Sequence, residues 1–148
     1  MAEEKLHLNW HEIQSRLPHG NGFRFVARAD VEGDSIVAVL DMVPLHNIFE
    51  DHFPDNPMVP GVILVEAIAQ AAGLLVLSTH PGLRGVLRGV DSTKFTKDVR
   101  PGDVALIEVT HFIHRASVWK FKGRVTVNGK EAARAIVSLA VTGGGPIE

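Results

Sequence analysis

Cysteine is absent from the 148-residue sequence, and no stretch of the chain carries charge of only one sign. Without cysteine the protein can form neither a disulfide framework nor a thiolate metal site, and it has no thiol nucleophile. The 15 basic and 17 acidic residues are mixed along the chain and leave a net charge of −2. This balance argues against nucleic-acid binding. We expect a cytoplasmic protein whose chemistry uses side chains other than thiols.

The sequence also lacks a secretory signal and a long uninterrupted apolar stretch. It opens with Met-Ala-Glu-Glu-Lys, unlike the basic start of a signal peptide. The longest apolar segment, 62–77, contains Glu66 and Gln70 and is shorter than the roughly 20 residues that cross a bilayer. We therefore expect a buried helix and no membrane span. Length and 45% hydrophobic content predict one domain over 1–148, with flexible ends at 1–8 and 143–148.

Turn-forming residues divide the chain into segments of regular structure, and Asn128-Gly129 is the strongest hairpin signal among them. We expect a short helix over 10–16 capped by Asn9, a rigid irregular loop over 44–60 and a long buried helix over 60–78. The expected strands cover 23–31, 35–43, 85–90, 104–114, 118–127 and 132–141. An antiparallel sheet curled around one helix would bury that helix and one face of each strand. The sequence thus predicts an α+β fold.

Two residues of the central segment have the properties of an acid and base pair. His52 lies in a loop stiffened by Pro54, Pro57 and Pro60, which would hold its side chain in place at low entropic cost. Glu66 lies among apolar helical residues, where an ionised carboxylate is disfavoured, so we expect its carboxyl to stay partly protonated. A histidine base beside a neutral carboxylic acid can remove one proton and supply another.

The start of the expected helix adds a binding element for a carbonyl oxygen. Backbone N–H groups at Gly61 and Val62 lack intrahelical partners, and Gly61 has no side chain to block approach. Gln70 follows Glu66 by four residues, so both lie on one helix face and Gln70 can orient the carboxyl by hydrogen bonding. The segment therefore combines a base, an acid and a site that polarises a carbonyl.

The motifs of this segment resemble those of the 3-hydroxyacyl-acyl-carrier-protein dehydratases of fatty-acid synthesis, the FabZ/FabA type. The resemblance covers most of the chain. It rests on Leu17-Pro18-His19, His52-Phe53-Pro54, Pro57, Pro60-Gly61-Val62, Glu66-Ala67, Ala69-Gln70, Gly89-Val90-Asp91, Lys94-Phe95 and Pro101-Gly102-Asp103. A histidine, proline anchors, a glycine and a glutamate at these separations form a specific pattern.

The resemblance implies a hotdog fold, in which an antiparallel sheet wraps one long central helix, assembled as a homodimer or a trimer of dimers. It implies that His52 of one subunit removes a proton next to the thioester carbonyl and that Glu66 of the other protonates the departing 3-hydroxyl. The carbonyl oxygen would bind Gly61 N–H, with Phe53, Pro60, Val62 and Gln70 completing the site. No cofactor is implied beyond the phosphopantetheine arm of an acyl carrier protein, which Lys94, Lys97 and Arg100 would attract.

Some positions depart from the family pattern. Asp51 and Asp55 stand where relatives carry glycine, often at the first position and usually at the second, which places two carboxylates beside the expected base. Gly20-Asn21-Gly22 replaces an Arg-Tyr-Pro motif, and the chain contains no tyrosine at all. The resemblance therefore leaves the accepted acyl chain length open, because a tyrosine gate over the acyl tunnel is missing.

Two other functions remain compatible with the sequence. A hotdog acyl thioesterase would use a carboxylate to activate water, although hydrolysis gives the His52 loop no role. A non-catalytic hotdog subunit that binds acyl chains is also compatible with Asp55 and the missing tyrosine. We expect no metal site: His111 and His114 lie three apart in a strand and should point to opposite faces. His19 is interpreted as a structural residue at the entrance.

Overall fold

The computed structural model describes residues 5–143 of the chain. Its strands are β1 (Leu6–Leu8), β2 (Val26–Glu32), β3 (Ser35–Leu40), β4 (Leu83–Phe95), β5 (Ala105–Arg115), β6 (Val118–Val127) and β7 (Lys130–Gly143). Its α-helices are α1 (Trp10–Arg16), α2 (His46–Asp51) and α3 (Gly61–Thr79). Two 3-10 turns complete the elements, η1 (Asn21–Phe23) and η2 (Val43–Leu45).

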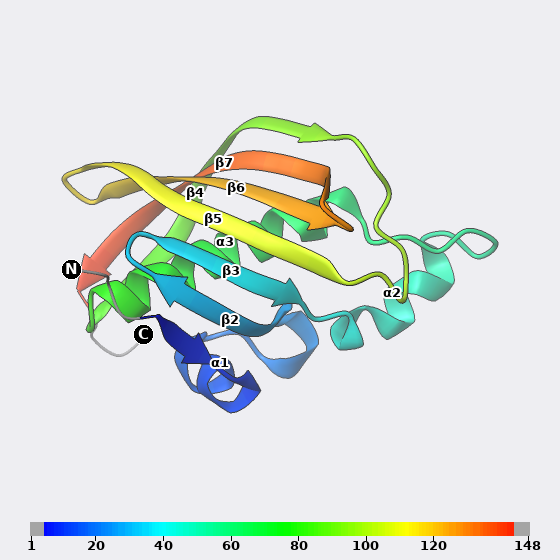
Figure 1. Ribbon diagram of the computed structural model, residues 1–148, viewed down its shortest axis with the longest axis horizontal. Coiled ribbons are helices and arrows are strands. Elements are labelled where there is room, and N and C mark those ends of the chain that lie inside the picture. Colours follow the sequence, from blue (N-terminus) through cyan, green and yellow to red (C-terminus); the bar gives the residue numbers. More distant parts are fainter. Residues whose placement is uncertain (1–4, 144–148) are drawn as a thin grey trace.

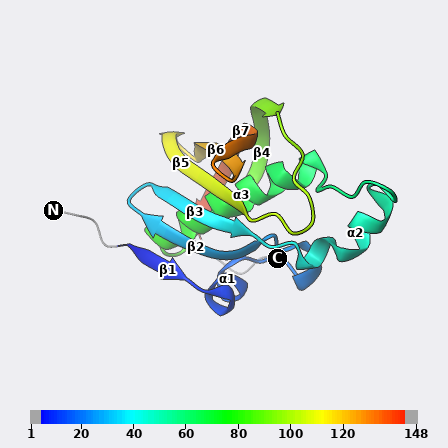
Figure 2. The same cartoon turned by 45° about the vertical axis from the view of Figure 1, so that its right-hand side comes forward.

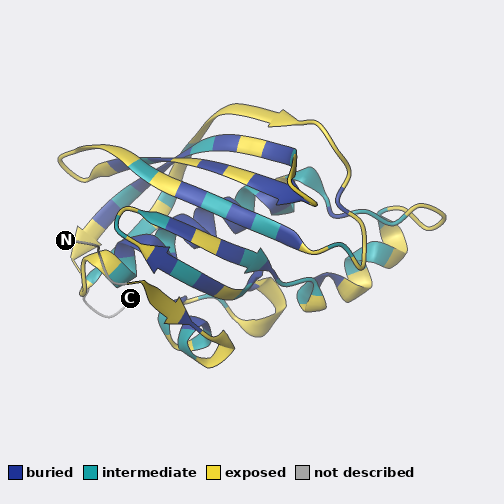
Figure 3. Ribbon diagram, in the orientation of Figure 1, coloured by how far each residue is buried: buried dark blue, intermediate teal, exposed yellow. Residues whose placement is uncertain are grey.

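The strands form one antiparallel sheet in the order β1-β2-β3-β5-β6-β7-β4. This sheet curves around α3, which lies in its concave side (Figure 1). The short β1, with α1 beside it, forms one edge of the sheet, and β4 forms the other (Figure 2). Buried and exposed residues alternate along the strands (Figure 3). The predicted architecture of a sheet wrapped around one helix is confirmed.

The helix α3 is the centre of the hydrophobic core. It is long and apolar enough to cross a membrane, yet 56% of its apolar window is buried inside the protein, so it is the core helix that the sequence predicted. The sheet lies close to α3 at Gly123 of β6, where an added Cβ would overlap the side chain of Ile68. Glycine is required there because no other residue leaves room for the helix.

Several local signals act as the sequence predicted. The side chain of Asn9 accepts from Glu12 N–H at 2.9 Å, and Glu12 accepts from Asn9 N–H at 3.3 Å, which closes a capping box at α1. Asn128 and Gly129 both have positive φ, 51° and 77°, the geometry of a tight hairpin turn between β6 and β7. Both features were predictable because each depends only on residues that are close together in the sequence.

Three expectations about the elements are wrong. The first part of the expected 44–60 loop is helical, since no proline interrupts His46–Asp51. β4 extends to Phe95, five residues beyond its expected end at 90. Residues 6–8, which we expected to be flexible, form β1 and pair with β2. Gly143, also expected to be flexible, is the last residue of β7, and the remaining expected flexible residues, 1–4 and 144–148, lie outside the described residues.

The two histidines of β5 lie on one side of the strand, contrary to the strand alternation that we assumed. The pairing of β5 with β6 shifts register between His111 and Ile113, and such a bulge reverses the alternation of the residues that follow. The rings of His111 and His114 therefore stack at 5.5 Å, and both contact Trp119. Burial lowers the pKa of His111 below its ordinary value.

Candidate active site

The carboxyl group of Glu66 is held by a buried amide one helical turn further along α3. Gln70 Nε2 donates to Glu66 Oε1 at 3.2 Å, so the predicted hydrogen bond is present. The same amide donates to Phe23 C=O at 2.8 Å and accepts from Phe25 N–H at 2.9 Å. Because these backbone groups fix Gln70, they also fix the direction in which it presents its N–H to Glu66.

His19 contacts the same carboxyl group, which the sequence analysis did not predict. Its Nε2 lies 3.5 Å from Glu66 Oε1, with the two side chains 28% and 22% exposed. The buried guanidinium of Arg24 donates to His19 C=O at 2.7 Å and to Asn21 Oδ1 at 2.8 Å, and so fixes the loop that carries His19. Glu66 therefore has two polar neighbours, Gln70 and His19, in addition to the apolar surroundings that we expected.

A cavity of about 710 Å³ opens beside Glu66. Residues of α3 and β4 form its walls, and the Leu17-Pro18-His19 motif lies at it as well. The lining residues are Arg16, Leu17, Pro18, His19, Glu66, Ala69, Gln70, Gly73, Leu77, Arg84, Gly85, Val86, Leu87, Leu139, Thr142 and Gly143. Since most of this lining is apolar and small, the cavity can accept a hydrocarbon chain that passes the carboxyl group.

The imidazole of His52 is held in one orientation at the end of α2. Its Nδ1 lies 3.0 Å from the carbonyl oxygen of Met58. Because a carbonyl can only accept, Nδ1 carries the proton in the neutral ring and Nε2 is left with a free lone pair. The ring also stacks on Phe53 at 4.2 Å. Nε2 is therefore the ring nitrogen that can accept a proton. Neither Asp51 nor Asp55 forms a hydrogen bond or ion pair with His52 within the described chain.

The first backbone N–H groups of α3 have no hydrogen-bond partner within the described residues. Pro60 C=O accepts from Ile63 N–H at 2.9 Å, and the helix has no side-chain cap. The earlier N–H groups, those of Gly61 and Val62, have no intrahelical acceptor. An added Cβ at Gly61 would lie 2.9 Å from the Phe95 ring, so glycine leaves room for this aromatic side chain over the helix start.

His52 and Glu66 are not brought together within one chain. No hydrogen bond or ion pair joins them in residues 5–143, and His52 does not line the cavity beside Glu66. α2 and the loop after it protrude at one end of the molecule (Figure 1). One subunit therefore offers the two halves of the predicted pair at separate places.

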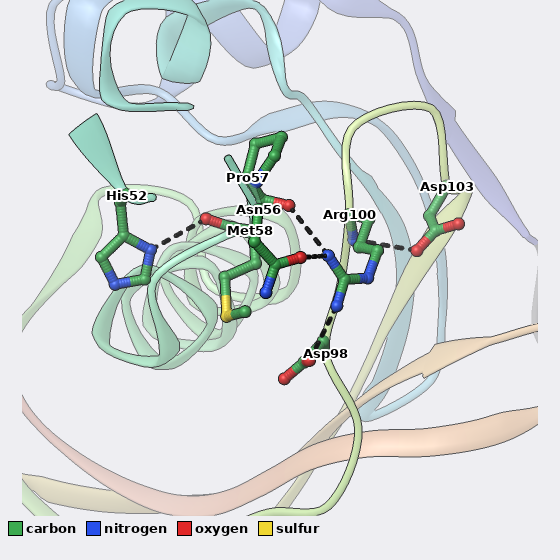
Figure 4. Close-up of polar contacts among 7 residues, drawn as sticks. All are labelled: His52, Asn56, Pro57, Met58, Asp98, Arg100 and Asp103. Atoms are coloured by element: carbon green, nitrogen blue, oxygen red, sulfur yellow. Dashed lines mark hydrogen bonds and ion pairs between the residues drawn. The ribbon is translucent and has the colours of Figure 1, made fainter. Parts of the chain in front are cut away.

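The three cations expected to attract a carrier protein have different surroundings. Lys94 lines a shallow depression of about 840 Å³ on the sheet, away from Glu66. Lys97 is exposed in the connection between β4 and β5. Arg100 contacts the loop that follows His52 (Figure 4). Within the described part of the chain, no group of three or more histidine or acidic side chains is arranged to hold a metal ion.

Comparisons with solved structures define the class as the hotdog proteins. A chain of the dehydratase heterocomplex ApeI:P from Xenorhabdus doucetiae matches with a TM-score of 0.73 at 16% identity, over 86% of this chain and 89% of that one. A thioesterase from Haemophilus influenzae matches with a TM-score of 0.68 at 14% identity, over 97% and 96%. At these identities the likeness establishes the fold alone.

The chain belongs to the FabA-like domain family, which matches residues 17–136. The 3-hydroxyacyl-acyl-carrier-protein dehydratase FabZ of Ruminiclostridium cellulolyticum is 38% identical over 135 residues, which are 88% of this chain and 95% of the relative. FabZ of Lactococcus lactis subsp. cremoris is 36% identical over 141 residues, 93% and 97% of the two chains. The family indicated by the sequence motifs is confirmed.

Proposed function

We propose that this protein is a FabZ-type dehydratase that converts 3-hydroxyacyl thioesters on acyl carrier protein into trans-2-enoyl thioesters and water. Membership of the family and the similarity to FabZ enzymes over nearly their whole length support this reaction. The main structural support for this reaction is the orientation of His52. Its Nδ1 is hydrogen-bonded to Met58 C=O, and its Nε2 is free to take a proton. A cytoplasmic location fits this role and the absence of cysteine.

The reaction divides between groups that lie at different places on the chain. His52 Nε2 removes the proton from the carbon next to the thioester carbonyl, while Gly61 N–H stabilises the negative charge that develops on the carbonyl oxygen. Glu66 gives its proton to the 3-hydroxyl group, which leaves as water. The electron pair of the broken C–H bond becomes the new double bond, so the reaction needs no redox cofactor.

The complete site is proposed to form in a homodimer, alone or as part of a trimer of dimers. β4 is a 13-residue strand at the sheet edge, with Val86 and Val90 exposed. A second copy that pairs along β4 would extend the sheet and bury these side chains. Since β4 also lines the cavity beside Glu66, the second copy would cover that cavity and bring the partner subunit's His52 toward it.

The test is an assay of purified protein on 3-hydroxyacyl carrier-protein substrates of several chain lengths, followed by the ultraviolet absorbance of the enoyl thioester. Wild-type protein should generate this absorbance, and His52→Ala and Glu66→Gln should each lower the rate at least a thousandfold. His7→Ala is the matched histidine control, because His7 is a surface residue paired with Asp30.

Two results would favour the other candidate functions. Release of free thiol without enoyl product would identify a thioesterase. Binding of acyl thioesters without turnover at any chain length would identify a non-catalytic subunit.

A further inference from the structure

Arg100 joins the connection between β4 and β5 to the loop that follows His52 (Figure 4). Its Nη1 donates to Asn56 Oδ1 and, at 3.4 Å, to Pro57 C=O. Its Nη2 donates to Asp98 Oδ2 at 3.1 Å. The planar guanidinium therefore binds three acceptors from two distant segments through two separate nitrogens, whereas the ammonium group of lysine has only one nitrogen.

The connection that carries Arg100 is itself fixed. Arg100 N–H donates to Asp103 Oδ2 at 2.9 Å, which closes a turn at Pro101-Gly102. One residue earlier, the carbonyl of Val99 accepts from Val59 N–H at 2.7 Å, and both valine side chains are buried. The His52 loop is thus held to a firm support at Asn56, at Pro57 and at Val59.

Met58 lies between the residues that are held. Its carbonyl oxygen accepts the hydrogen bond of His52 Nδ1 at 3.0 Å, and its N–H donates to His52 C=O at 2.9 Å. Pro57 and Val59, on either side of Met58, are the residues bonded to Arg100 and Val99. The direction of the Met58 carbonyl, and with it the orientation and tautomer of His52, follows from these contacts.

We propose that Arg100 is a positioning residue for His52, acting through Asn56, Pro57 and the carbonyl of Met58. This inference rests on the proposed dehydratase function and replaces the expectation that Arg100 attracts the carrier protein. Asp98 and Asp103 lie against Arg100, so its positive charge is offset locally and would steer an acidic partner weakly. Its hydrogen bonds instead suit a clamp, by which we mean a side chain that holds the loop after His52 to the connection between β4 and β5.

The two roles are separated by comparing substrates with and without the carrier protein. The same 3-hydroxyacyl group is attached to acyl carrier protein and to pantetheine, and kcat and KM are measured for wild type and Arg100→Met. Positioning predicts a fall in kcat of about tenfold on both substrates, with KM for the carrier protein nearly unchanged. Carrier attraction predicts a higher KM on the carrier substrate alone, which would overturn the proposal, as would wild-type kinetics on both.

Three further variants sharpen this comparison. Lys130→Met removes an exposed cation that has no assigned role in the site and should keep the wild-type kcat on acyl pantetheine. Arg100→Lys keeps the charge, but its single nitrogen cannot occupy the positions of both Nη1 and Nη2, so it should remain as slow as Arg100→Met. Asn56→Ala should slow the enzyme as well, and its effect should not add to that of Arg100→Met because both break one contact.

A second measurement does not depend on turnover. Nitrogen NMR of the His52 ring at neutral pH should report the single Nδ1–H tautomer in wild type and a mixture of tautomers in Arg100→Met. A pure Nδ1–H tautomer in the variant would contradict the clamp even if no substrate were turned over. Wild-type protein that lacks dehydratase activity but shows the tautomer change would refute the proposed function and keep the positioning role.

Discussion

At the scale of single residues, each proposed catalytic side chain is oriented by a nearby polar group that is itself held by more distant parts of the chain. Glu66 is held by Gln70 and approached by His19, and His52 is held by the Met58 carbonyl. The chemistry therefore depends on hydrogen bonds that span the fold and that tie two distant loops to α3 and α2. Substitutions at these supporting positions should alter rate more than substrate binding.

His19 provides the first such prediction. Replacing it by leucine removes the imidazole nitrogen that lies 3.5 Å from Glu66 Oε1 and leaves the carboxyl held by Gln70. We expect His19→Leu to lower kcat roughly three- to tenfold with little change in KM. Steady-state kinetics beside the His7→Ala control would show this, and an unchanged kcat would mean that His19 only packs the cavity entrance.

His111 provides a prediction about stability and pH. Burial, as the main cause, lowers its pKa below the ordinary 6.5, with His114 and His80 acting in the same direction and the Ile113 carbonyl and Asp34 opposing it. Unfolded protein then binds the proton more readily, so the contribution of His111 to stability is present above pH 6.5 and is lost as pH falls below it.

The measurement is urea unfolding at about pH 7.5 and about pH 5.5. The free energy of unfolding of wild type should decrease more between these pH values than that of His111→Phe, which keeps a ring against Trp119 without a titrating group. Parallel decreases in the two proteins would show that other groups govern the acid sensitivity.

The part of the site that sequence predicted is the part governed by local geometry. Four-residue spacing on a helix is enough to place Gln70 against Glu66, and the helix start is enough to expose Gly61 N–H. The contacts of His19 and Arg100 could not be predicted in the same way. They join residues far apart in sequence, and only the packing of loops against α3 and the sheet brings them together.

At the scale of elements, the contact between Gly123 of β6 and Ile68 of α3 shows how closely the sheet packs against the helix. Gly123→Ala places a Cβ against Ile68, which is fully buried and cannot move aside. We expect this variant to lose about 1–3 kcal/mol of unfolding free energy. Gly102→Ala, which has open space around its Cβ but a φ of 92°, separates this overlap from backbone strain.

A double-mutant cycle tests the same contact. Ile68→Ala alone should cost about 2–5 kcal/mol by leaving a cavity. In the double variant the new methyl group of Gly123→Ala enters that cavity, so the combined loss should be smaller than the sum of the two single losses. Urea unfolding of the four proteins measures the difference, and strict additivity would argue against the contact.

The elements that sequence predicted are those with strong periodicity or specific turns, such as α3 and the Asn128-Gly129 hairpin. α2 was not predicted because prolines lie on both sides of it and the whole region was interpreted as a loop. The six residues of α2 themselves contain no proline. β1 has only three residues, too few to show alternation, and it exists because β2 offers an edge to pair with. The bulge in β5 was not predicted from the sequence. Because of it, His111 and His114 lie on the same side of the strand and not on opposite sides as expected.

At the scale of the whole molecule, the separation of His52 from Glu66 predicts complementation between inactive variants. His52→Ala and Glu66→Gln subunits, mixed after reversible dissociation, should form mixed dimers in which one of the two sites has both wild-type residues. With random pairing, activity should return to about a quarter of wild type. Each variant alone, treated identically, is the control, and a mixture that stays inactive would place both residues of a site on one subunit.

The two edges of the sheet differ in a way that bears on aggregation. The 13-residue β4 has no strand on its outer side among the described residues, whereas β1 at the opposite edge has three residues and is preceded by Lys5. If two copies paired through β4, the long edge strand of each would be covered, and only the short β1 edges would stay exposed. The β1 edges that stay exposed are too short to pair with a further copy. The proposed association would therefore end at a dimer and would not grow into a fibre.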